Sequence, residues 1–170
     1  MTGLPQPNEY LEYYGDYIRR VSEEDIIDAM GKQLVETLAV IRRIPEEKTS
    51  EHLDDKWSVR EIVGHLCDAE RNFAYRAYRF SRNDTDALPG FEQDDYVREG
   101  NANQRATDDL LDEFALLRRS TIAAFRGITP DIGLRAGVAS GNKITVRALL
   151  YLTVGHERRH VEILRERFGV

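Results

Sequence analysis

The sequence predicts an all-α protein built as a four-helix bundle. Two observations carry this prediction. Four long segments repeat apolar residues at helical spacing, and residue patterns that begin helices precede most of them. The expected helices of roughly 20–24 residues exceed the globular mean of about 11–12, and long amphipathic helices in one domain favour a bundle. No stretch alternates apolar and polar residues strongly enough to predict a sheet.

The first helix is expected from Ser22 to Ile44. Ser22 can accept the free backbone N–H groups of the first turn, and Asp25 stands three residues later, where it can reach back to the start of the helix. Pro45 cannot continue a helix and ends it.

The second helix is expected from Ser58 to Phe80. Ser58 and Glu61 have the spacing of a capping box, and Trp57 and Ile62 have that of the accompanying hydrophobic contact. We interpret the single tryptophan as a structural contact at this helix entrance, with stacking on a substrate as the alternative.

The third and fourth helices are expected over residues 107–127 and 145–169. The connection between the second and third helices, residues 82–106, is about 25 residues long, which is too long for a simple hairpin. It must cross the end of the bundle or run along it and alter the order of the helices. The stretch 128–143 is rich in glycine, and the tyrosine-rich segment 1–21 is expected to form a short helix packed on the bundle.

Length and composition limit the class of protein. The chain of 170 residues is expected to form one domain, and its 24 basic and 30 acidic residues give a net charge of −6. This charge is a poor match for nucleic acids or anionic membranes, and no apolar run is long enough to span a bilayer. Residues 1–10 show no secretory signal, so a cytoplasmic protein is expected. The single cysteine, Cys67, excludes an internal disulfide and is interpreted as a packing residue.

The histidines are the strongest candidates for a functional site. His156 and His160 are four residues apart, which places both side chains on one face of the fourth helix. His65 flanks the apolar stripe of the second helix and can meet them if the two helices are antiparallel. A metal ion that is held by three histidines and has coordination positions left open is typical of a catalytic site. The alternative is three ordinary histidines hydrogen-bonded to carbonyls and carboxylates, and we interpret His52 as a solvated residue.

Two stretches carry a resemblance to a known family. Residues 57–70 read WSVREIVGHLCDAE and residues 155–164 read GHERRHVEIL. Together they resemble the DinB-like (DinB/YfiT) superfamily, and the similarity extends from about residue 22 to residue 168. The resemblance implies a four-helix bundle with a divalent metal ion, nickel, zinc, iron or manganese, held by His65, His156 and His160. It also implies a homodimer and a role among metal-dependent hydrolases, transferases of low-molecular-weight thiols such as bacillithiol or mycothiol, or proteins of unknown role.

The chemistry of such a site suits two reactions. A divalent ion lowers the pKa of a bound water from 15.7 toward about 7, and it binds thiols in their reactive thiolate form. The expected function is a metal-dependent hydrolase or thiol transferase acting on a small molecule. The alternative is a non-catalytic metal-binding or stress-related interaction protein.

Four further residues are candidates near the metal. Glu61 and Glu157 can orient an imidazole or handle a proton, unless Glu61 serves only the capping box and Glu157 is a solvated surface acid. Phe91 and Tyr96 either wall the substrate side or plug the end of the bundle. A fifth residue, Arg76, either receives an anionic substrate group or makes a surface salt bridge.

Overall fold

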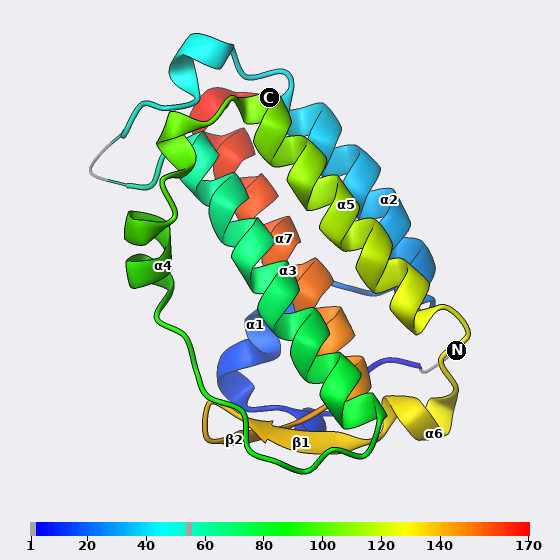
Figure 1. Ribbon diagram of the computed structural model, residues 1–170. Coiled ribbons are helices and arrows are strands. Elements are labelled where there is room, and N and C mark those ends of the chain that lie inside the picture. The colour runs from blue at the N-terminus through cyan, green and yellow to red at the C-terminus, as the bar shows by residue number, and fades with distance from the viewer. Residues whose placement is uncertain (1–2, 54–55) are drawn as a thin grey trace.

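The computed structural model describes residues 3–53 and 56–170 and shows a four-helix bundle, as predicted (Figure 1). Met1, Thr2, Asp54 and Asp55 lie outside the described residues, so the description omits the start of the tyrosine-rich segment and two residues between the first two long helices. The long helices are α2 (Ile26–Ile41), α3 (Val59–Ser81), α5 (Thr107–Phe125) and α7 (Val146–Phe168). The short elements are α1 (Gly15–Ile18), α4 (Gln93–Glu99), α6 (Pro130–Gly133), and strands β1 (Ala136–Ala139) and β2 (Asn142–Thr145).

The four long helices do not follow a simple up-and-down order. Both α2 and α3 pack against α5 and α7, so α2 and α3 occupy opposite corners of the bundle. In Figure 1, α2 and α7 run upward while α3 and α5 run downward. The neighbours α3 and α7 are therefore antiparallel.

The connection between α3 and α5 makes this order possible. It leaves the lower end of α3, runs back along the outside of the bundle through α4, and delivers the chain to the upper end, where α5 begins (Figure 1). Of the two paths that the sequence left open for residues 82–106, the chain takes the one along the bundle.

The start of α2 differs from the prediction. The helix begins at Ile26, and Asp25 is its cap, accepting a backbone N–H of the first turn at 3.1 Å. The expected start at Ser22 is wrong because tertiary contacts hold the preceding backbone. The Tyr151 hydroxyl of α7 donates to the carbonyls of Glu23 and Glu24 at 2.7 and 3.2 Å, so they are held by α7 instead of opening a helix.

The other predicted helix starts are confirmed. Ser58 and Glu61 form the capping box of α3. Thr145 caps α7, which ends at Gly169 with a φ of +66°. Both caps use only neighbouring residues, which explains why the sequence reveals them.

One small sheet was not predicted. Strands β1 and β2 form an antiparallel hairpin beside the lower end of α3 (Figure 1). Its turn places Ser140 at φ +51° and Gly141 at φ +75°, the left-handed backbone that tight hairpins require. The expectation that no sheet forms is wrong here because four-residue strands are too short to show a pattern of alternation.

The apolar core is divided into two clusters. One contains Met30, Phe73 and Leu149, and the other contains Leu34, Leu66 and Leu111. Along α5 and α7, the buried charged residues Arg118 and Glu157 lie between the residues of one cluster and those of the other. None of the helices in the described part of the chain is both long and apolar enough to cross a bilayer.

Helix α1 packs against α7 at a point where only glycine fits. A Cβ added to Gly155 would lie 1.9 Å from the Tyr17 carbonyl oxygen, which belongs to backbone and cannot rotate away. The tyrosine-rich segment therefore packs directly on α7, and the point of closest contact, Gly155, immediately precedes His156.

We predict that Gly155→Ala lowers the free energy of unfolding by about 1–3 kcal/mol, the usual cost of overpacking. Urea unfolding measures it. Gly31→Ala is the matched control, because nothing lies within 4 Å of its added Cβ, and alanine should gain about 0.5–1 kcal/mol inside α2. Equal stabilisation by both substitutions would contradict the close packing of α1.

Candidate metal centre

The structure brings the three predicted histidines together. Because α3 and α7 are antiparallel, His65 near the start of α3 faces the later half of α7. The Nε2 atom of His156 lies 3.0 Å from that of His65 and 3.3 Å from that of His160. One nitrogen atom from each ring lies within 4.8 Å of the other two.

Burial keeps these imidazoles neutral. It lowers the pKa of His65 to about 4 and that of His160 to about 3. Burial also lowers the pKa of His156 well below its ordinary value, and the two neighbouring imidazoles act in the same direction. All three rings are therefore uncharged at pH 7, the form that binds metal ions.

The cluster fits a cation better than it fits hydrogen bonds. Tetrahedral coordination with metal–nitrogen distances of 2.0–2.1 Å separates the donors by about 3.3 Å, close to the two separations seen here. A neutral His156 has one ring lone pair on Nε2 at most and cannot accept from both neighbours. The Nδ1 atoms of His65 and His160 are buried without a hydrogen-bond partner among the described residues. The hydrogen-bonded alternative is therefore wrong for these two atoms.

Aromatic rings surround the cluster. The Trp57 ring lies 4.9 Å from that of His65 and is stacked at 6.4 Å on that of His160. Tyr17 and Phe73 lie 5.5 and 5.8 Å from His156. Trp57 thus covers the histidines as well as the helix entrance.

A pocket of about 290 Å³ opens beside the cluster. His65 and His156 lie in its wall, together with Tyr14 and Tyr17 of the N-terminal segment. Phe91, from the connection along the bundle, lines it as well, which agrees with the wall interpretation and not with a plug. Tyr96 packs against Phe91, with ring centroids 5.1 Å apart, but does not line this pocket.

Arg76 lines the same pocket and makes no salt bridge within the described part of the chain. Its Nη2 donates to the Pro89 carbonyl at 2.8 Å and to Ser140 Oγ at 3.1 Å. The salt-bridge interpretation of this residue is therefore wrong.

Three other residues considered from the sequence, Glu61, His52 and Cys67, lie outside the histidine cluster. Glu61 completes the capping box and lies 2.8 Å from His52, whose side chain is exposed, as expected. Cys67 is buried, which raises the pKa of its thiol to about 12 and makes it unreactive. Its interpretation as a packing residue is confirmed.

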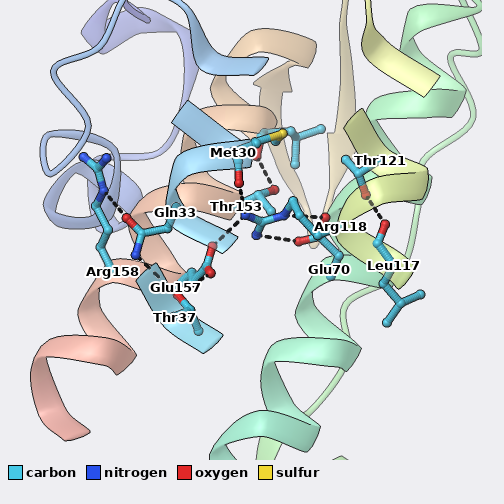
Figure 2. A network of polar contacts seen from close by, with 11 residues as sticks. Met30, Gln33, Thr37, Glu70, Leu117, Arg118, Thr121, Thr153, Glu157 and Arg158 are labelled. Carbon is cyan, nitrogen blue, oxygen red and sulfur yellow. Dashed lines mark hydrogen bonds and ion pairs between the residues drawn. The ribbon is translucent and has the colours of Figure 1, made fainter. Parts of the chain in front are cut away.

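Glu157 points into the centre of the bundle and not into the pocket (Figure 2). It is 1% exposed, so its interpretation as a solvated acid is wrong. Its carboxylate accepts from Arg118 at 2.7 Å and from the Thr37 hydroxyl at 2.6 Å. Arg118 also binds both carboxylate oxygens of Glu70, at 3.0 and 2.9 Å.

This buried network connects all four long helices. Thr37 comes from α2, Glu70 from α3, Arg118 from α5 and Glu157 from α7. In Figure 2 the two carboxylates meet the guanidinium, and Thr37 joins through Glu157. Sequence reasoning missed it, although one signal was present. Arg118 follows Phe114 by four residues on the apolar stripe of its helix, where a charged residue needs buried partners.

The fold and the cluster define a class of proteins: four-helix bundles that carry three converging histidines beside a pocket. A sequence profile described as the DinB superfamily matches residues 29–164. The chain belongs to the DinB superfamily.

The comparison of structures agrees with this assignment. The fold is similar to that of YfiT from Bacillus subtilis, which is described as a probable metal-dependent hydrolase with an unusual four-helix bundle topology. The TM-score is 0.69, the sequences are 19% identical, and the match covers 97% of this chain and 93% of the other. No curated protein has a matching sequence.

We predict that Arg118→Met lowers the free energy of unfolding at pH 7 by about 3–5 kcal/mol, because Glu70 and Glu157 lose their buried cation. Burial already raises the pKa of Glu157. Without Arg118 the buried carboxyl of Glu157 should bind a proton more readily when folded than when unfolded, so the deficit should shrink as the pH falls from 7 to 5.

Urea unfolding at both pH values tests this. The adjacent Arg119 is exposed, so Arg119→Met is the matched control and should change stability by no more than about 0.5 kcal/mol. A loss that is the same at pH 5 and pH 7 would show that the carboxylates carry no uncompensated charge.

Proposed function

We propose that this protein is a metal-dependent enzyme acting on a small molecule, with a divalent ion held by His65, His156 and His160. Nickel, zinc, iron and manganese are the candidate ions. The observation that carries the proposal is the convergence of three neutral imidazoles, two of which, His65 and His156, lie in the wall of a pocket.

The donor set decides what the ion would contribute. Three uncharged ligands leave a divalent ion its full charge, and when bound it would supply Lewis acidity toward a water, a thiol or a carbonyl group. Trp57, Tyr17 and Phe73 limit the access of bulk water to the histidines, which strengthens electrostatic effects there.

The proton acceptor is better sought in the pocket than at the two acids named from the sequence. Glu61 is engaged in its capping box, and Glu157 is paired with Arg118. Asp94 lines the pocket, and its charge opposes the lowering of the pKa of His65. We therefore assign proton transfer to Asp94.

Hydrolysis is the first candidate reaction and thiol transfer the second. The description of YfiT as a probable metal-dependent hydrolase supports the first. The resemblance of the histidine motifs to thiol-transferring members supports the second. A pocket beside the cluster supports turnover over metal storage, because storage needs no space for a substrate.

We predict that the protein purified without a histidine tag binds divalent metal and that His160→Ala weakens binding by more than about a hundredfold, beyond the 10–100-fold typical when only an outer partner is removed. Equilibrium dialysis with elemental analysis measures this. His52→Ala is the matched control, since His52 is exposed and belongs to no cluster of potential ligands among the described residues. Unchanged metal content in His160→Ala would rule out the proposed ligands.

We predict that the metal-loaded protein turns over members of an ester and amide panel, or joins a thiol to an electrophile, and that EDTA abolishes the activity. Asp94→Asn should lower kcat by about 10²–10⁴-fold, the usual contribution of an acid or base, while metal content stays unchanged. Absence of turnover with every candidate ion would favour the non-catalytic alternative.

A further inference from the structure

Arg76 carries a buried charge that forms no ion pair with any residue the structure describes. The residue is 5% exposed, and burial lowers the pKa of its guanidinium. Its two hydrogen bonds go to uncharged oxygens, those of Pro89 and Ser140. A buried cation without an anion is costly, so such residues usually have a partner.

The other buried arginine of the described chain follows that rule, because Arg118 pairs with the carboxylates of Glu70 and Glu157. Arg76 differs in this respect. The N–H groups on its Nε and Nη1 have no partner among the described residues, and neither atom is fully buried.

The position of Arg76 relates it to the histidine cluster. His65 and Arg76 are eleven residues apart on α3, which returns to the same face after three turns and separates their Cα atoms by about 16 Å. Ala69 and Phe73 lie between them on that face, and all four residues line the one pocket. The pocket therefore has a cluster of nitrogen donors at one end, an apolar floor, and a guanidinium at the other end.

The charge around the pocket selects the kind of anion. Arg76 is the one arginine or lysine among the described residues that line it, and Glu92 and Asp94 line it as well. These two acids repel a phosphate dianion more strongly than a ligand with a single negative charge, so they favour a monoanion as the partner of this one cation.

We infer that the substrate is a small carboxylic acid with an apolar body, and that Arg76 binds its carboxylate while its reacting group lies at the histidine cluster. This inference rests on the proposed function, since it takes the pocket to be the substrate site. Arg76 is thus the residue that determines specificity for an acid, through charged hydrogen bonds from Nε and Nη1.

Binding of simple probes tests the inference without turnover. Hexanoate and the uncharged 1-hexanol are titrated calorimetrically into the protein as purified and after EDTA treatment, with inorganic phosphate as a third probe. Hexanoate should bind more tightly than hexanol and phosphate. Arg76→Gln should weaken hexanoate binding by about ten- to a hundredfold, the value of hydrogen bonds to a charged group, and leave hexanol unaffected.

Two further variants complete the design. Arg76→Lys keeps the charge and should retain part of the affinity for hexanoate. If Arg76→Gln does not fold, this variant still tests whether the side chain at position 76 binds the carboxylate. Arg82→Gln is the matched control for net charge, because Arg82 is exposed at the end of the same helix. This variant should bind hexanoate like the unmodified protein.

Equal affinity for hexanoate in Arg76→Gln and Arg82→Gln, no binding of hexanoate, or preferential binding of phosphate would overturn the inference. Failure of the proposed metal site has a different signature. In that case the His160→Ala and unmodified proteins would hold equal metal, while hexanoate would still bind through Arg76.

Discussion

The buried Arg118 guanidinium is the interaction on which the arrangement of this bundle depends. It pairs with Glu70 of α3 and Glu157 of α7 and donates to the Met30 carbonyl of α2 at 3.4 Å, so one charged group from α5 reaches each of the other three helices. Such a group is satisfied only when all four helices have the correct rotation and register. Apolar contacts are less selective, since they tolerate small shifts of one helix against another.

The network and the histidine cluster use two different faces of the same helix, α7. Glu157 follows His156 directly, so the rotation of α7 that turns the carboxylate toward the bundle centre turns the preceding imidazole toward α3 and the pocket. The order of the helices supplies the other half of the site. Because the chain returns along the bundle after α3, that helix lies antiparallel to α7 and presents His65 at the required level.

Local chemistry explains which parts of this structure the sequence predicts. The caps at Ser58 and Thr145 involve only neighbouring residues, and the histidine pair follows from helical spacing. The late start of α2 escapes prediction because the Tyr151 hydroxyl, distant in sequence, holds the carbonyls before it. The partners of Glu157 and the lack of an anion beside Arg76 are likewise properties of the packed chain. The position of Arg118 on an apolar stripe indicates that it needs a buried partner, but it does not identify Glu157 as that partner.

The pocket is walled in part by segments outside the four long helices. Tyr14 and Tyr17 precede the bundle, and Phe91 belongs to the chain that runs along it, whereas the histidines stand on α3 and α7. The parts that would hold an ion and the parts that would shape its surroundings are thus separate in the chain. Relatives can exchange the outer segments, and with them the molecules they accept, while the ion-holding scaffold beneath stays unaltered.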